Sequence, residues 1–304
     1  MSISLQHISK SYKKQKALDD ITLDVKSGEL FGLIGPDGAG KTTLFRILTT
    51  LLLADEGKAT VAGMDVVNNY KSIRKSVGYM PGRFSLYQDL TVAENLNFFA
   101  TIFGTTLEEN YSLIEDIYVQ IEPFKDRRAG KLSGGMKQKL ALCCALIHKP
   151  KVLFLDEPTT GVDPVSRKEF WEMLKRLNAH NITILVSTPY MDEAALCDRI
   201  ALIQKGKILQ LDTPENIIAK HNKTIYNVSA TNVSKLIQDL KAYPSQQSVY
   251  AFGEFIHYTD TNPNFSSKNL KEYLQAHAHS NIEIFPAITT IEDVFMDLAS
   301  TNKN

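Results

Sequence analysis

A glycine-rich stretch that follows a short apolar run constrains the fold of this chain more than any other sequence feature. The run is Leu30-Phe-Gly-Leu-Ile34, and the stretch is Gly35-Pro-Asp-Gly-Ala-Gly40-Lys41-Thr42. It matches the pattern G-x-x-x-x-G-K-[ST], and we expect a helix to begin near Lys41. A buried strand, a tight loop and a helix in this order indicate an α/β domain with a largely parallel sheet.

The residue types of this loop indicate phosphate binding. Glycines let backbone N–H groups turn inward at the start of a helix, where they can cradle phosphate groups. Lys41 supplies positive charge for the β and γ phosphates, and the Thr42 hydroxyl can ligate Mg²⁺. The loop therefore predicts a nucleotide site.

Two adjacent carboxylates provide the partner that such a loop needs. Val152-Leu-Phe-Leu is a second apolar run, and Asp156 and Glu157 follow it directly. In open α/β sheets, ligands lie at the carboxyl ends of the strands. We expect Asp156 to take part in the Mg²⁺ shell and Glu157 to polarise the attacking water.

The rest of the chain reads as two domains. The α/β pattern runs from residue 1 to 212, and its alternating stretches Ile3–Ile8 and Ile21–Val25 predict an antiparallel side sheet. Helical periodicity without a strand predicts a helical insertion at about 83–146. Residues 213–304 are expected to form a small accessory α+β domain, because their units follow the order of a split β-α-β fold.

A third motif lies just before the strand that ends in Asp156. It reads Leu132-Ser133-Gly134-Gly135-Met136-Lys137-Gln138 and forms a second helix start that can face an anion. One nucleotide site in one chain would not require it. With this motif, residues 1 to about 212 resemble the ATP-binding subunits of ABC transporters, whose LSGGQ signature presses on the nucleotide held by a partner subunit.

The resemblance implies a P-loop ATPase fold and a set of site residues. Glu157 is the implied catalytic residue, and Thr42 and Asp156 are the implied Mg²⁺ ligands. Tyr12 is the residue implied to stack on adenine. The implied phosphate contacts come from the loop, that is from Gly35, Pro36, Asp37, Gly38, Ala39, Gly40, Lys41, Thr42 and Thr43. The residues implied to contact the nucleotide of the partner subunit are Ser133, Gly134, Gly135 and Asp163.

Two positions depart from the family pattern. Family members carry a glutamine that contacts Mg²⁺ and the attacking water after a Val-Gly-Tyr-x-Pro stretch, but here Gly82 follows Pro81. The contact is then lost, or a neighbour such as Arg83 or Gln88 supplies it. The family's switch histidine belongs to a T-H-x-x-x-E stretch, and Pro189 stands at that position. Proline offers neither a side-chain donor nor a backbone N–H.

These departures predict a slow site. Loss of one transition-state donor commonly costs about 10² to 10³ in rate. We expect this chain's own site to bind ATP and to turn it over slowly, while its signature completes a competent site on a different subunit. The open alternative is a homodimer in which neighbouring residues compensate for Gly82 and Pro189.

Other features indicate an exporter subunit. No apolar run reaches the ~18 residues of a spanning helix, so the membrane-spanning subunits are expected to be separate chains. The stretches from Arg83 to Val92 and from Thr290 to Phe295 resemble the ATPases of ABC-2 type exporters, including multidrug systems. Some relatives carry two ATPase domains in one polypeptide, and this chain resembles the first of them.

Composition limits the remaining function classes. Lys plus Arg equals Asp plus Glu at 34 each, which weighs against a nucleic-acid partner. The three cysteines lack metal-ligand spacing and suggest a reducing compartment. The amino-terminal residues show no secretory signal pattern, so we expect a cytoplasmic protein. With separate membrane-spanning subunits, it is expected to be peripheral on the inner face of the cell membrane. The alternative function is a soluble ATP-dependent interaction or regulatory module of the same family.

Overall fold

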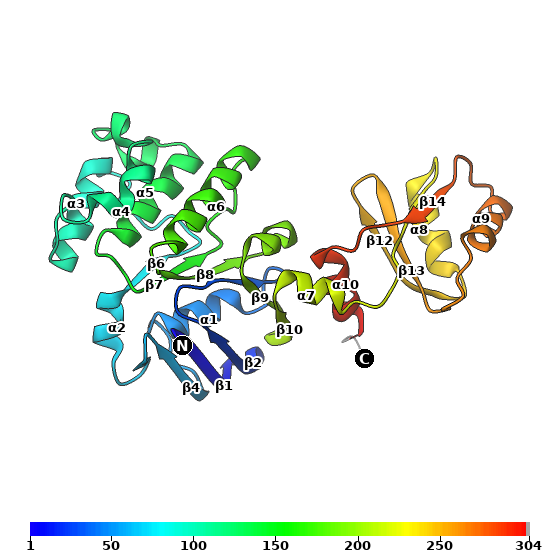
Figure 1. Cartoon of the computed structure of the whole chain (residues 1–304), viewed down its shortest axis with the longest axis horizontal. Coiled ribbons are helices and arrows are strands. Elements are labelled where there is room, and N and C mark those ends of the chain that lie inside the picture. Colours follow the sequence, from blue (N-terminus) through cyan, green and yellow to red (C-terminus); the bar gives the residue numbers. More distant parts are fainter. Residues whose placement is uncertain (302–304) are drawn as a thin grey trace. The chain divides into compact units, whose positions relative to one another are not determined.

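The computed structural model describes residues 1–301, and Figure 1 shows their arrangement as strands and helices. The chain divides into two compact units, of which the first is Met1–Pro214 and the second begins at Glu215. The predicted α/β core, antiparallel side sheet, helical insertion and C-terminal α+β unit are all confirmed.

A six-stranded sheet forms the centre of the first unit. Its strands are, in spatial order, β10 (Lys207–Asp212), β9 (Arg199–Gln204), β3 (Leu30–Ile34), β8 (Thr183–Thr188), β7 (Val152–Asp156) and β6 (Val77–Met80). All neighbours pair in parallel except β10, which pairs with β9 in a hairpin. Every residue of β3, β7 and β8 is buried, as expected for parallel strands that are covered on both faces.

Strand β8 ends later than its apolar run predicts. The run Ile182–Val186 accounts for most of the strand, but pairing continues through Ser187 and Thr188, both of which are fully buried. The parallel register places Ser187 opposite Asp156 at the end of β7. The apolar pattern alone could not predict that the strand includes these two hydroxyl residues. Hydrogen bonds make their burial possible, and the pattern does not show those bonds.

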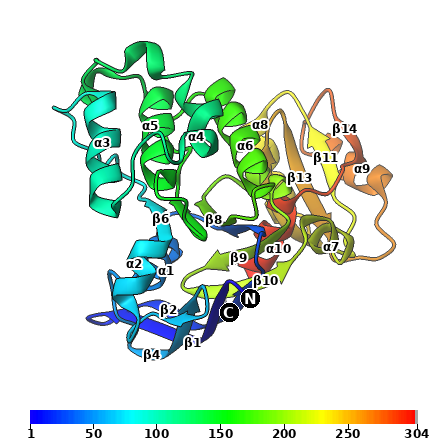
Figure 2. The same cartoon turned by 60° about the vertical axis from the view of Figure 1, so that its left-hand side comes forward.

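An antiparallel side sheet completes the first unit. Its order is β2 (Gln15–Val25), β1 (Ile3–Tyr12), β4 (Glu56–Val61) and β5 (Met64–Asp65). Figure 2 shows β1, β2 and β4 together on one side of helix α1 (Lys41–Leu48). The first two strands are longer than predicted, because alternation is lost where they reach the exposed turn between them.

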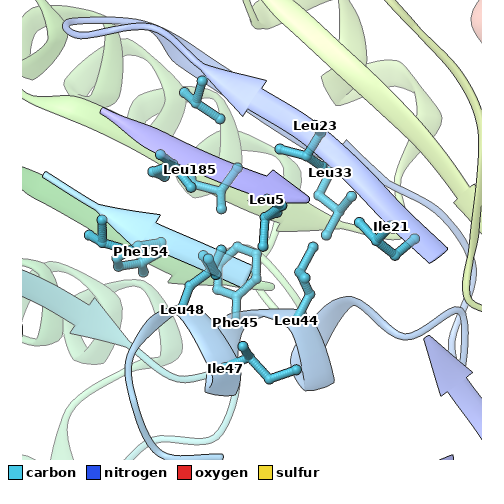
Figure 3. Packing of buried hydrophobic residues seen from close by; sticks show 14 of the residues in the cluster. Leu5, Ile21, Leu23, Leu33, Leu44, Phe45, Ile47, Leu48, Phe154 and Leu185 are labelled. Carbon is cyan, nitrogen blue, oxygen red and sulfur yellow. The ribbon is translucent and has the colours of Figure 1, made fainter. Parts of the chain in front are cut away.

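One hydrophobic core fixes α1 between the two sheets. Figure 3 shows Leu44, Phe45 and Leu48 of α1 among side chains of the side sheet and of the central sheet. The Phe45 ring meets Phe154 of β7 edge to face, with 5.9 Å between ring centroids. Burial of a large apolar side chain contributes about 1.5–3 kcal/mol. The start of α1 is therefore held rigidly at the end of β3.

Helices cover the central sheet and form the insertion. Helix α2 (Tyr70–Ser76) leads into β6, and α6 (Pro164–Asn178) follows β7. The insertion contains α3 (Val92–Phe103), α4 (Tyr111–Tyr118) and α5 (Gly134–Leu146). A capping box between Thr91 and Glu94 starts α3. The expected helical character of this segment is confirmed.

The second unit is a four-stranded antiparallel sheet with helices. Its elements are α7 (Pro214–Ala219), β11 (Tyr226–Ser229), α8 (Val233–Ala242), β12 (Gln246–Phe252), β13 (Phe255–Asp260), α9 (Ser267–Ala276), β14 (Glu283–Pro286) and α10 (Ile291–Thr301). The sheet order β12-β13-β11-β14 is that of the predicted split β-α-β fold. Buried Asp293 of α10 accepts hydrogen bonds from Thr290 and Tyr250, which ties this helix to β12.

Candidate functional site

The glycine-rich loop joins β3 to α1 and requires its glycines for space. A Cβ at Gly35 would lie 2.1 Å from the carbonyl oxygen of Ile203. Gly40 has φ +107°, and a Cβ there would lie 2.5 Å from the carbonyl oxygen of Ala17. A side chain at Gly35 or Gly40 would collide with this neighbouring backbone, and the positive φ of Gly40 also disfavours any residue other than glycine. The loop is consequently pressed against neighbouring backbone, and its N–H groups are fixed at the start of α1.

The start of α1 is open to an anion. Its first turn contains no acidic residue, and the N-cap Gly40 provides no side-chain hydrogen bond. The first N–H groups of a helix lack partners within the helix, and the helix dipole adds positive potential there. Thr42 and Thr43 are half-buried in this first turn. Pro36, Asp37, Gly38 and Ala39 complete the loop that leads into it.

Lys41 is buried and folds back over the loop. Its side chain is 3% exposed, and its Nζ donates hydrogen bonds to the carbonyl oxygens of Gly35 (2.7 Å) and Pro36 (3.0 Å). The same Nζ lies 3.1 Å from Oε1 of Glu157. An ammonium group this deeply buried needs negative partners. Lys41 is thus held at the place where a bound phosphate would meet it.

The two predicted carboxylates lie at the carboxyl end of β7. Asp156 is 2% exposed, and its Oδ1 accepts a hydrogen bond of 2.6 Å from the Ser187 hydroxyl. Glu157 has φ +52°, which turns its side chain toward Lys41. Burial raises the pKa of Tyr79 to about 12, and the nearby Asp156 carboxylate adds a smaller part of this rise. The loop, Lys41, Asp156 and Glu157 therefore form one cluster.

The signature motif forms a second cluster with Asp163. Ser133 is the N-cap of α5 and accepts a hydrogen bond from the Met136 N–H (3.4 Å). A Cβ at Gly135 would lie 2.9 Å from Oγ of Ser166, so the motif packs closely on the start of α6. Asp163 caps that helix by accepting from the Ser166 N–H (3.0 Å), and this bond lowers the Asp163 pKa.

The two clusters are separate. Within residues 1–301, no side-chain hydrogen bond or ion pair joins Lys41, Asp156 or Glu157 to the Ser133–Gly135 segment or to Asp163. Gly134 instead lies near Gly161, since a Cβ there would be 3.7 Å from the Gly161 carbonyl oxygen. Tyr12 is 43% exposed at the end of β1, with its ring available to a flat partner. Each cluster is thus held by its own contacts.

Both departures from the family pattern follow strands of the central sheet, as Glu157 does. Gly82 follows β6, and a Cβ on it would lie 3.0 Å from the carbonyl oxygen of Asp156. Pro189 follows the last residue of β8 and is half-buried. Gln88, one of the neighbours that could replace the missing amide, lies instead against Gly130, whose N–H donates to its carbonyl oxygen (2.9 Å).

Sequence reasoning missed two polar residues at this edge of the sheet. One is Ser187, the hydrogen-bond donor to Asp156. The other is Glu193, 2% exposed, whose carboxylate accepts from Thr188 (2.5 Å) and Thr159 (2.8 Å). The sequence does carry one signal for Ser187, because the apolar run Ile182–Val186 is followed directly by the hydroxyl residues Ser187 and Thr188. A polar residue that is buried with such a strand needs a hydrogen-bond partner.

The residues of the first cluster suit a nucleotide with Mg²⁺. Backbone N–H groups, a buried ammonium and a helix start suit phosphates. A threonine hydroxyl and a carboxylate are the oxygen ligands that Mg²⁺ prefers, and this ion usually keeps waters and substrate oxygens as its other ligands. Among residues 1–301, no group of three or more His, Cys, Asp or Glu side chains is placed to hold a metal ion. The Thr42 hydroxyl and the Asp156 carboxylate fit Mg²⁺ that is bound together with phosphates.

Comparisons with known proteins agree with this geometry. A family model described as "ABC transporter" matches residues 18–160. The probable multidrug ABC transporter ATP-binding protein YbhF of Escherichia coli (strain K12) is 46% identical over 201 residues, which cover 66% of this chain and 35% of YbhF. The chain thus spans about a third of that relative's length. Nod factor export ATP-binding protein I of Rhizobium sp. (strain N33) is 34% identical over 302 residues, covering 98% of this chain and 97% of the relative.

Solved structures show the same fold. A structure of an ATP-binding subunit of an ABC transporter superposes with a TM-score of 0.66 at 26% identity, over 72% of this chain and 93% of that chain. The dimeric structure of MJ0796, a bacterial ABC transporter cassette, gives a TM-score of 0.63 at 26% identity, over 69% and 98%. Together with the full-length likeness to a named relative, these matches show that the chain belongs to the family of ABC transporter ATP-binding proteins, which are P-loop ATPases.

Proposed function

We propose that this chain is the nucleotide-binding subunit of an ABC exporter, in which it binds ATP with Mg²⁺ and couples ATP binding and hydrolysis to transport by separate membrane-spanning subunits. The observation that carries the proposal is the buried Lys41 ammonium, which is held at the start of α1 beside Glu157 at the end of β7. The names of the two relatives, a multidrug transporter ATP-binding protein and a Nod factor export protein, support the export role.

Each residue of the first cluster has a role in this proposal. Lys41 and the N–H groups of the loop bind the β and γ phosphates, and Thr42 and Asp156 hold Mg²⁺. When bound, Mg²⁺ would neutralise charge on the phosphate oxygens. Lys41 would exchange its contact with Glu157 for a phosphate oxygen. The Glu157 carboxylate would then be free to accept a proton from water.

A second ATP-binding subunit completes the arrangement that we propose. Ser133, Gly134, Gly135 and Asp163 belong to a cluster without a side-chain bond to Lys41 or the carboxylates. This separation supports a role for them at the nucleotide site of the other subunit. A different partner chain suits the proposal better than a second copy, because a homodimer would repeat the same two substitutions at both sites.

We propose that this chain's own site turns ATP over slowly. Gly82 has no side-chain amide to place near Asp156, and Pro189 has neither a side-chain donor nor a backbone N–H at the end of β8. The phosphate loop, Lys41, Thr42 and Asp156 are all present, so we expect this site to bind ATP. Removal of one transition-state donor costs about 10² to 10³ in rate.

Membrane attachment is the part of the proposal that depends on partners. Within residues 1–301, none of the helices combines the length and apolar character that crossing a bilayer requires. We propose that the chain sits peripherally on the inner face of the cell membrane through its membrane-spanning partners. Affinity purification from detergent-solubilised membranes would then retain a stoichiometric integral membrane protein with the tagged chain. Recovery of the chain without any membrane protein would contradict this part.

Nucleotide binding is tested directly on the purified chain. We expect a fluorescent ATP analogue with Mg²⁺ to bind the wild type, and Lys41→Ala to weaken binding by at least tenfold, because the phosphates lose their buried cation. Lys58→Ala, at an exposed lysine of β4, is the matched control and should bind as the wild type does. Equal binding by all three proteins would contradict the proposed site.

A further inference from the structure

Ser187 contacts both acidic residues of the proposed site. Its side chain is completely buried at the end of β8, and its Oγ donates a hydrogen bond of 2.6 Å to Oδ1 of Asp156. The backbone N–H of Glu157 donates to the same Oγ over 3.1 Å and to the Ser187 carbonyl oxygen over 3.0 Å. The parallel register of β7 and β8 places Ser187 directly opposite Asp156.

The single hydrogen of the hydroxyl assigns the direction of each bond. Because the Glu157 N–H can only donate, the Ser187 oxygen must accept there. The hydroxyl hydrogen is then committed to Asp156. One oxygen of this buried carboxylate is therefore held by a neutral donor, while no donor among the described residues is found at Oδ2, which stays available to a cation.

The contact with Glu157 fixes a backbone turn. Glu157 has φ +52°, a left-handed conformation that a side chain other than glycine adopts only when its surroundings hold it there. Two acceptors on Ser187 receive the Glu157 N–H and hold this turn. The turn directs the Glu157 side chain to within 3.1 Å of Lys41.

We propose that Ser187 is a positioning residue that orients Asp156 for Mg²⁺ and holds Glu157 in its left-handed turn. The inference rests on the proposed function, since it gives a supporting role to a residue that touches neither phosphate nor metal. Partners of metal-binding carboxylates commonly contribute 10- to 100-fold to metal affinity by fixing the orientation of the ligand. Ser187 should therefore affect the Mg²⁺ requirement of nucleotide binding more than nucleotide binding itself.

A Mg²⁺ titration separates this role from a merely structural one. Binding of a fluorescent ATP analogue is measured in EDTA and then at increasing MgCl₂ for the wild type, Ser187→Ala and Ser187→Thr. We expect Ser187→Ala to raise the half-saturating Mg²⁺ concentration by about tenfold or more, with its affinity in EDTA within twofold of the wild type. Ser187→Thr keeps the hydroxyl and should restore most of the Mg²⁺ response.

Thr188→Val is the matched control. It removes a neighbouring, equally buried hydroxyl that donates to Glu193 rather than to Asp156, so its half-saturating Mg²⁺ concentration should stay at the wild-type value. An unchanged Mg²⁺ response in Ser187→Ala, or an equal shift in Thr188→Val, would overturn the inference. If Ser187→Ala does not fold, failure of Ser187→Thr to keep the wild-type Mg²⁺ response would overturn it.

A different result would contradict the proposed function itself. The wild type would then not bind the analogue, or Lys41→Ala would bind it as tightly as the wild type does. Either result would overturn both proposals at the level of the phosphate loop. If nucleotide binding depends on Lys41 but Ser187→Ala has the half-saturating Mg²⁺ concentration of the wild type, only the role of Ser187 is overturned.

Discussion

Gly82 and Pro189 are single residues with a direct bearing on the proposed chemistry. Both follow strands of the central sheet at the edge where Asp156 and Glu157 lie. A Cβ at Gly82 would lie 3.0 Å from the backbone carbonyl oxygen of Asp156 and 3.7 Å from Cβ of Glu157, so the position borders the backbone that carries both carboxylates. We expect a glutamine and a histidine at these two places to supply donors to this edge of the sheet.

Restoring these side chains is expected to restore turnover. The double variant Gly82→Gln/Pro189→His should hydrolyse ATP about 100-fold faster than the wild type, because one well-placed donor is worth about 10² to 10³ in rate. The backbone must yield by a few tenths of an ångström at residue 82 to admit the new Cβ. Steady-state phosphate release measures the effect. The same double variant with Glu157→Gln added should stay at the basal rate, and an unchanged rate in the double variant would contradict the assignment of these positions.

The loop glycine Gly40 offers a second test at the residue scale. Gly40→Ala should reduce ATP affinity by at least tenfold, because its φ of +107° disfavours alanine and the added Cβ would lie 2.5 Å from the Ala17 carbonyl oxygen. Gly63→Ala has a comparable strain at φ +76° but open space around the Cβ, so it should keep wild-type affinity. Titration with a fluorescent ATP analogue checks both variants. Equal affinities would show that the loop tolerates movement.

At the scale of elements, Glu193 joins three segments that surround the carboxylates. Its buried carboxylate accepts from Thr188 at the end of β8 and from Thr159 in the loop after β7. Arg167 of α6 lies 3.4 Å from the same group and also pairs with Asp192 (2.6 Å). The strand, the loop and the helix that Asp163 caps are therefore held together through one side chain.

Removal of this side chain should destabilise the first unit. Glu193→Ala leaves the buried hydroxyls of Thr159 and Thr188 without their acceptor and removes one of the two carboxylate partners of Arg167. A buried polar group that loses its partner costs about 1–3 kcal/mol. We expect urea denaturation to show a loss of about 3 kcal/mol in the free energy of unfolding. Glu169→Ala removes the partner of Lys139 at a half-exposed site and should cost less than about 1 kcal/mol. Similar losses in both variants would contradict the assigned network.

His148, which follows helix α5, should make stability depend on pH. It stacks on Phe103 with 3.7 Å between ring centroids, its Nε2 donates to the Val77 carbonyl oxygen, and burial lowers its pKa below the usual 6.5. The unfolded chain thus takes up a proton at a higher pH than the folded chain does. The contribution of His148 is complete above pH 6.5 and is lost as the pH falls below that value. Urea denaturation at pH 7.5 and 5.5 should show a larger loss for the wild type than for His148→Gln, and equal losses would contradict it.

The elements that could be predicted from the sequence are those marked by a continuous apolar run or by a known motif. Apolar runs identify β3 and most of β7, and the motif chemistry brings Lys41 and Glu157 together, which the structure places 3.1 Å apart. Strand β6 could not be predicted, because four residues that include a glycine carry little periodic signal. Ser187 and Glu193 were missed because each depends on a partner in a distant segment, Asp156 for Ser187 and Thr159 for Glu193, which no local pattern shows.

At the scale of the molecule, the two clusters of the first unit explain why a partner is part of the account. One chain supplies a phosphate loop with its carboxylates and, separately, a signature with Asp163. In the pair of subunits that we propose, each loop would meet the other subunit's signature. The substitutions at Gly82 and Pro189 then affect this chain's loop and leave its signature unaltered.

The most direct test of this account is steady-state ATP hydrolysis by the purified wild-type chain at saturating ATP and Mg²⁺, compared with Glu157→Gln. Binding of the nucleotide is confirmed in the same samples. We expect both proteins to bind ATP and the hydrolysis rate of the wild type to exceed that of Glu157→Gln only marginally. Rapid, Glu157-dependent turnover by the wild-type chain alone would contradict it, because the Gly82 and Pro189 positions would then be compensated within a homodimer.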